Sequence, residues 1–162
     1  MATRTTHRFR FRVSPDDLNA RFADPAYYAW INEIVGCWDV VEQPPPTPRA
    51  GNSDELHVCY AMKIQASIPL PETLKKLLGG ALTLKRTDRW NAADRAGSID
   101  VAIKGLPVRI GATTRLEPAG NEVEVVSDWI LKCDIPLIGG IVERLGCQEI
   151  EKRLMLECAA VR

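Results

Sequence analysis

Arg86 and Asp88, two positions apart, have the clearest potential for chemistry in the chain. They belong to a segment in which Leu82, Leu84 and Trp90 also occupy alternate positions, and alternate residues of a strand point to one side. Both charged side chains are therefore expected on an apolar face, where a buried charge needs a partner or a ligand. Three interpretations stay open: a structural ion pair, a bulge that turns both side chains outward, and contact with a ligand.

Three other polar residues, His7, Thr114 and Ser127, also share alternating faces with apolar residues. His7 is the first residue of its predicted strand. A histidine at such a position more often lies at the edge of a site or is hydrogen-bonded in the core than acts as a general base. The sequence has no glycine-rich phosphate loop, nucleophile elbow or paired-carboxylate motif. Gly139 and Gly140 lack the Lys-Ser/Thr of a phosphate loop, so we expect them to let a helix start close to the sheet. We assign no catalytic residue and favour a non-enzymatic role.

Cysteine and histidine usage indicates neither a disulfide framework nor a metal site. The five cysteines are Cys37, Cys59, Cys133, Cys147 and Cys158. Their odd number and the lack of any C-x-x-C pair predict buried, reduced thiols in a cytosolic protein. His7 and His57 have no second ligand at a zinc-type spacing. We expect no metal and no cofactor.

Charge balance limits the classes of partner. The 21 basic and 21 acidic residues give a net charge of zero, whereas proteins that bind nucleic acid or anionic membranes carry an excess of lysine and arginine. Arg8, Arg10 and Arg12 are therefore interpreted as a solvated strand face. The longest apolar run, from Ile135 to Val142, is far shorter than the ~18 residues of a membrane helix. We expect a cytoplasmic protein with no integral membrane segment and no nucleic-acid partner.

The elements that must position these residues begin with a strand and two short helices. Strict alternation over 7–13 predicts the strand. Ser14 followed by Pro15, and Asp24 followed by Pro25, each match an N-cap and a first helical residue. The chain length of 162 residues fits one domain spanning residues 1–162.

Six further strands are predicted after these helices. They are Val35–Gln43, Leu56–Ile64, Leu82–Trp90, Ser98–Lys104, Leu106–Leu116 and Val123–Cys133. Short glycine-containing connections make the last four an antiparallel meander. An exposed proline-rich loop over Pro44–Asp54 joins the first two, and a short helical insert is expected over Glu72–Leu78.

After Pro136 the hydrophobic period changes from two to about 3.6. The resulting apolar stripes are Ile138, Ile141, Val142 and Leu145, and Cys147, Ile150, Leu154, Cys158 and Val161. They lie on nearly opposite sides of an ideal helix, so the helix either bends or breaks near Gly146 or is covered on two faces. We favour one long helix with a local adjustment at Gly146. The order of elements predicts an α+β helix-grip fold, in which a seven-stranded curved antiparallel sheet wraps around the C-terminal helix. The space between sheet and helix is the expected ligand site.

Several short strings carry a family resemblance. They are Ser14-Pro15 and Asp24-Pro25 after the opening strand, Trp90 in the middle strand, and Ile135-Pro136-Leu137-Ile138-Gly139-Gly140 followed by Glu143. With the order of elements, they resemble the START-like superfamily, which includes polyketide cyclases, plant allergen-type ligand carriers and lipid-transfer domains. More narrowly, the chain resembles an uncharacterised actinobacterial START-like family. The resemblance implies a helix-grip fold and an apolar cavity, and it transfers no catalytic residue.

The candidate ligand-binding residues are those predicted to face this cavity. They are Tyr60, Met62, Leu84, Arg86, Asp88, Trp90, Val108, Ile110, Ser127, Trp129, Ile141 and Leu145. Several of the aromatic side chains are expected to fill the core instead, as large aromatics commonly do.

Three functional hypotheses follow. We favour a binder or carrier of a small hydrophobic or amphipathic molecule, lipid-like or polyketide-like. The alternative is an enzyme of the cyclase or aromatase kind, in which Arg86, Asp88 or Tyr60 positions a reactive carbonyl. The third is a partner-binding module that uses the Pro44–Asp54 loop or an open sheet edge.

Overall fold

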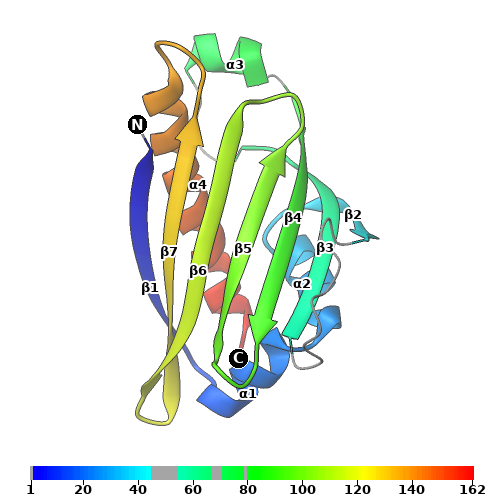
Figure 1. The fold of residues 1–162 in the computed structure, drawn as a ribbon, viewed down its shortest axis with the longest axis vertical. Helices are drawn as coiled ribbons and strands as arrows, with labels where there is room; N and C mark the ends of the chain where they lie inside the picture. Colours follow the sequence, from blue (N-terminus) through cyan, green and yellow to red (C-terminus); the bar gives the residue numbers. More distant parts are fainter. Residues whose placement is uncertain (1, 45–54, 67–70, 79) are drawn as a thin grey trace.

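The computed structural model describes residues 2–44, 55–66, 71–78 and 80–162, which form a curved sheet packed against a long C-terminal helix (Figure 1). The strands are β1 (Thr3–Phe11), β2 (Trp38–Gln43), β3 (Glu55–Ile64), β4 (Leu82–Asn91), β5 (Ala96–Ile103), β6 (Val108–Ala119) and β7 (Glu122–Cys133). The helices are α1 (Pro15–Phe22), α2 (Pro25–Ile34), α3 (Glu72–Leu78) and α4 (Gly139–Ala160). The predicted helix-grip architecture is confirmed.

Neighbouring strands of the sheet are antiparallel throughout, in the order β1-β7-β6-β5-β4-β3-β2. The meander predicted for the last four strands is confirmed, since β4 to β7 pair consecutively. β1 returns to pair with β7, so β1 and β2 form the two edges. α4 lies behind β7 and β6 in Figure 1 and makes its sheet contacts chiefly with β1 and β7.

Both short helices start where the sequence predicts. The Ser14 hydroxyl accepts a hydrogen bond from the Asp17 amide at 3.1 Å, and Asp24 accepts one from the Ala26 amide at 3.0 Å. These bonds satisfy amide groups that a helix N-terminus leaves without a partner. A proline stands at the start of each helix, where its missing N–H costs nothing.

Two of the strands start later than predicted because glycine turns precede them. β2 begins at Trp38 and not at Val35, since Gly36 adopts a φ of +98° and the Cys37 amide still bonds to the carbonyl of Asn32. β6 begins at Val108 and not at Leu106, which lies in the turn made by Gly105 at a φ of +80°. Positions 45–54 of the predicted proline-rich loop lie outside the described residues.

The first turns of α4 are held against the sheet by Gly139 and Glu143. A Cβ atom on Gly139 would lie 2.5 Å from the carbonyl oxygen of Cys133, which shows how closely the helix start approaches the end of β7. Glu143 is buried, and its two carboxylate oxygens accept hydrogen bonds from the Thr3 hydroxyl at 2.6 Å and from the Cys133 amide at 2.9 Å. One side chain thus joins α4 to both β1 and β7.

α4 continues through Gly146 as one uninterrupted helix. An added Cβ at Gly146 would lie 2.5 Å from the Leu131 side chain, so this glycine allows the helix to pass close to β7. Ile150 and Leu154 pack on Trp129 and the neighbouring residues of the sheet. The two apolar stripes therefore contact different parts of the interior along the length of a single helix.

The main core lies between the sheet and the two short helices, with Trp90 near its centre. The Trp90 indole donates a hydrogen bond to Asn19 at 2.9 Å and meets the Phe22 ring edge-on at a centroid distance of 5.0 Å. Trp90 is only 3% exposed. This tryptophan fixes α1 to β4, which is the core role expected for part of the aromatic set.

Replacing Gly139 by alanine is expected to lower the free energy of unfolding by about 1–3 kcal/mol, the usual cost of forcing extra volume into a packed site. Gly140→Ala is the matched control, because an added Cβ there meets open space. We expect its stability to be unchanged or raised by up to about 1 kcal/mol. Urea denaturation of both variants measures the difference, and equal stabilities would contradict the close approach at Gly139.

Glu143→Gln is expected to destabilise the fold in a pH-dependent way. The hydrogen bonds from Thr3 and Cys133 hold the pKa of Glu143 below its ordinary value of 4.5. Its contribution to stability is therefore complete above that value and is lost as the pH falls through the lowered pKa of the folded state. We expect a cost of about 1.5–3 kcal/mol at neutral pH that shrinks in acid.

Denaturant unfolding from neutral to acidic pH measures this effect, with Glu151→Gln as the control on the exposed face of the same helix. A penalty that stays constant with pH would show that the Glu143 charge is not what stabilises the contact.

Candidate functional site

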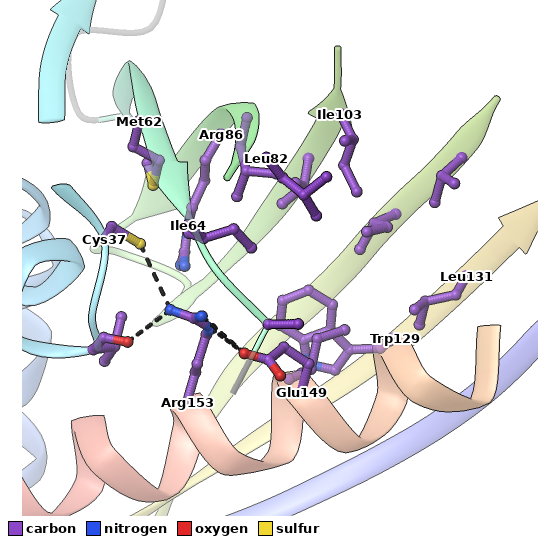
Figure 2. A pocket seen from close by; sticks show the side chains of 18 of the residues that line it. Cys37, Met62, Ile64, Leu82, Arg86, Ile103, Trp129, Leu131, Glu149 and Arg153 are labelled. Carbon is purple, nitrogen blue, oxygen red and sulfur yellow. Dashed lines mark hydrogen bonds and ion pairs between the residues drawn. The ribbon is translucent and has the colours of Figure 1, made fainter. Parts of the chain in front are cut away.

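A cavity of about 180 Å³ lies between the sheet and α4 (Figure 2). Its walls are largely aliphatic and come from strands β3 to β7 and from α4. These wall residues include Met62, Ile64, Leu82, Leu84, Val101, Ile103, Val108, Ile110, Leu131, Leu145, Ile150 and Leu154. An engineered apolar cavity of about 150 Å³ is large enough to bind benzene, so this volume suits a small ring system or a short alkyl chain.

Arg153 ties α4 to the opposite wall of this cavity. Its guanidinium donates to the Val35 carbonyl at 2.7 Å and the Gln65 carbonyl at 3.1 Å, and it pairs with Glu149 at 2.8 Å (Figure 2). Cys37 lies 3.9 Å from the same guanidinium. Burial nevertheless raises the pKa of the Cys37 thiol, so it packs as a neutral group.

A second cavity of about 50 Å³ lies toward α1 and α2. Aromatic residues form much of its wall, among them Phe9, Phe11, Phe22, Tyr27, Tyr28 and Trp90. Four residues border both cavities: Arg86, Trp129, Leu154 and Glu157. An arginine and a glutamate therefore stand at the boundary between a mainly aliphatic and a mainly aromatic compartment.

Arg86 and Asp88 face the interior from β4 and bind each other in a bidentate pair. Nε lies 2.9 Å and Nη2 lies 3.0 Å from the two carboxylate oxygens, and the Asp88 side chain is only 4% exposed. Burial alone would lower the pKa of Arg86, but Asp88 and the charge of Glu157 raise it, so the guanidinium stays protonated. The structural ion pair is therefore present, and no bulge turns the two side chains outward.

Glu157 reaches the same region from α4. It accepts a hydrogen bond from the Tyr27 hydroxyl at 2.6 Å. Burial raises the pKa of Glu157, and the Tyr27 hydrogen bond and the charge of Arg86 oppose this rise without cancelling it. Burial likewise raises the pKa of Tyr27 far above its ordinary value, so its hydroxyl remains a donor.

Most of the candidate ligand-binding residues border one of the two cavities. Those on the larger cavity are Met62, Leu84, Arg86, Val108, Ile110, Trp129 and Leu145, and those on the smaller are Arg86, Asp88, Trp90, Ser127 and Trp129. The alternation of the strands thus places charged and apolar candidates around a shared space.

Tyr60 and Ile141 border neither of these two cavities. The Tyr60 hydroxyl donates to the Pro25 carbonyl at 3.2 Å, so α2 covers this end of β3. Ile141 is 37% exposed, because it lies on a side of α4 that the sheet does not cover. The sequence pattern predicts that both residues face the cavity, but the structure places neither side chain on its wall.

The three polar residues His7, Ser127 and Thr114 pair across β1, β7 and β6. The Ser127 hydroxyl accepts a hydrogen bond from the Trp129 indole at 2.9 Å. Thr114 Oγ1 is buried and has no hydrogen-bond partner among the described residues. Ser127 and Thr114 border the smaller cavity, whereas His7 borders neither.

Sequence reasoning missed the helical side chains of the site. Glu149, Arg153 and Glu157 follow one another at a spacing of four, so α4 presents them on one face. That spacing was the available signal. The spacing alone does not show that these side chains face the interior, because the apolar residues of this helix do not lie on a single side.

No group of three His, Cys, Asp or Glu side chains suited to a metal ion occurs within the described ranges. In the same part of the chain, no helix combines the length and the apolar character needed to cross a membrane.

Comparison with known proteins gives a family match and many similar folds. Residues 6–162 match the family described as "Protein of unknown function (DUF2505)". No curated protein matches the chain. The residues matched cover nearly the whole chain.

Several solved structures share the fold at low sequence identity. Zhui aromatase/cyclase from Streptomyces sp. R1128 is 8% identical with a TM-score of 0.71, over 99% of this chain and 93% of that one. Norcoclaurine synthase from Thalictrum flavum is 13% identical with a TM-score of 0.66, over 99% and 86%. A START superfamily protein from Mycobacterium smegmatis is 10% identical with a TM-score of 0.62, over 98% and 96%. These similarities confirm the START-like fold.

Asp88→Asn is expected to lower the free energy of unfolding by about 3 kcal/mol, since removing one charge of a buried ion pair leaves the other without a partner. Replacing both residues, as in Arg86→Met with Asp88→Leu, is expected to restore most of the lost stability. Asp100→Asn on the exposed face of β5 is the control. Thermal and urea unfolding measure the three variants, and a single Asp88 variant as stable as the unaltered protein would show that the pair is not structural.

Proposed function

The chain belongs to the family of proteins of unknown function DUF2505, and on the START-like fold of this member we propose that it binds or carries a small hydrophobic or amphipathic molecule. The proposed site is the cavity between the sheet and α4, and residues 1–162 are proposed to act as one ligand-binding domain. A lipid-like or polyketide-like compound is the kind of ligand that we propose.

The apolar wall of the larger cavity is the observation that carries this proposal. Its volume of about 180 Å³ is a space that apolar side chains border without filling. Protein interiors are normally packed as densely as organic crystals, and empty space forfeits dispersion contacts. A ligand that occupies the cavity would restore those contacts and bury its own apolar surface.

The proposed ligand contacts are the candidate residues that border the two cavities. Met62, Leu84, Val108, Ile110 and Leu145 are proposed to contact the apolar part of the ligand, because they lie on the aliphatic wall. Trp129 borders both compartments, and we propose that it contacts the ligand at their junction together with Arg86. Asp88, Trp90 and Ser127 are proposed as contacts from the smaller cavity.

The cyclase or aromatase hypothesis remains second. Arg86 and Asp88 do face inward within hydrogen-bond distance of each other, as such an enzyme would require. Each satisfies the charge of the other, however, and the Tyr60 hydroxyl is bound to the Pro25 carbonyl. These contacts leave the named groups engaged with the protein, which favours binding over catalysis as the proposal.

The partner-binding hypothesis has less support within the described residues. β2 is a sheet edge, and a free edge can pair with another strand. The other feature named for this role, the loop after β2, falls at positions 45–54, which lie outside the described residues.

Val101→Phe is expected to weaken binding of a small neutral fluorophore such as naphthalene by at least about tenfold, because the phenylalanine ring would project into the cavity from β5. Ala102→Phe is the matched control, since the adjacent residue is exposed and points to the other side of the sheet. Fluorescence titration measures both affinities, and equal affinities would place the bound naphthalene elsewhere.

Organic extraction of the protein purified from its native source, followed by mass spectrometry, tests the proposal independently. We expect a reproducible apolar or amphipathic compound in the extract. No compound in the extract, together with no naphthalene binding, would contradict the proposed function.

A further inference from the structure

The ionisable side chains around the two cavities are almost all matched with a partner. Arg86 pairs with Asp88, and Arg153 pairs with Glu149. Glu143 accepts hydrogen bonds from a hydroxyl and a backbone amide at the start of α4. Two of these contacts are therefore ion pairs, whereas Glu143 is bound by neutral donors.

Glu157 borders both cavities and, like Glu143, has no cationic partner in the part of the chain that the structure describes, since its hydrogen bond comes from the neutral Tyr27 hydroxyl. Among the described residues, no cationic group lies within ion-pair distance of its carboxylate. Arg86, whose charge acts on Glu157, directs Nε and Nη2 at Asp88. Arg86, Asp88 and Glu157, the charged side chains that face this boundary, thus carry one more negative than positive charge when all three are ionised.

We infer that the ligand is an amphipathic amine, whose ammonium group binds Glu157 at the boundary of the two cavities and whose apolar part occupies the larger one. An ammonium group offers three hydrogen-bond donors and the positive charge that this wall lacks. The cavity volume of about 180 Å³ limits the apolar part to a short alkyl chain or a small ring system. This inference rests on the proposed binding function and specifies its ligand class.

An anionic ligand fits the same position poorly. Arg86 borders both cavities, but its charge is matched by Asp88 in a bidentate pair. A carboxylate placed there would approach Glu157 and Asp88, and like charges in a poorly solvated site repel strongly. The excess of acid over base at the boundary therefore selects against anions as well as for cations.

Binding of an ammonium group is coupled to the protonation of Glu157. The groups that face it are Tyr27 and Tyr28 from α2, Arg86 and Asp88 from β4, and Cys158 beside it on α4. Burial raises the pKa of Glu157 in the free protein. A bound cation favours the carboxylate and lowers that pKa, so binding releases a proton wherever the free carboxyl is protonated. Amine affinity should accordingly rise with pH and level off once Glu157 is ionised.

Isothermal titration calorimetry with octylamine, octanol and octanoate tests the inference, because these probes differ in their polar group and share the alkyl chain. We expect octylamine to bind at least about tenfold more tightly than octanol, and octanoate to bind most weakly. The octylamine affinity should rise as the pH is raised from the ordinary glutamate value of 4.5, and it should level off once the carboxyl group is ionised. At the acidic end, the binding heat should depend on the ionisation enthalpy of the buffer, which reports proton release.

Glu157→Gln is expected to remove the preference for octylamine over octanol, while Glu151→Gln on the exposed face of α4 keeps it. The buffer dependence uses the unaltered protein, so the inference is tested even if Glu157→Gln does not fold. Octanol binding with no amine preference and no proton release would overturn the amine inference and leave the proposed binding function standing. Failure of all three probes and of naphthalene to bind would instead contradict the binding function itself.

Discussion

The width of the sheet is the constraint on which the rest of the structure depends. Seven strands spaced about 4.8 Å apart extend across roughly 29 Å, whereas a helix with its side chains is about 10–12 Å wide. α4 can therefore cover only part of the sheet, and its sheet contacts are chiefly with β1 and β7. α1 and α2 cover a further part near Trp90. Strand residues that neither α4 nor the two short helices cover therefore border the cavity with their apolar side chains.

Anchoring at both ends of α4 keeps this space from collapsing. Near its start, Glu143 binds β1 and β7, and Gly139 places the helix against the end of β7. Farther along, Arg153 reaches across to the Val35 and Gln65 carbonyls. Polar contacts with defined geometry thus hold the helix at a fixed distance where apolar packing alone would favour closure. The same contacts bind the charged groups of Glu143 and Arg153 to other parts of the protein, so the space beside them is bordered mainly by apolar side chains.

The extent to which this fold could be predicted follows from the kind of signal each element carries. Alternation along β4 placed Arg86, Asp88 and Trp90 on the inner face, and the structure has them there, because a strand has only two faces to choose between. The helix starts at Ser14 and Asp24 were equally accessible, since a cap is a local interaction. Tyr60 was assigned to the same side, but which inner residues α2 covers is a matter of packing between distant segments.

The contribution of α4 to the site was the part that sequence could not supply. Its residues meet the cavity, the core and solvent in turn, so no single apolar stripe indicates which side is buried. Glu157 illustrates the difficulty, because a glutamate on a helix is ordinarily a solvated residue. Its position becomes informative only when Tyr27 and Arg86, from two other elements, are seen to face it. A glutamate that is unremarkable in the sequence is thereby a carboxylate at the boundary of the two cavities, bound by a neutral hydroxyl and not by a cation.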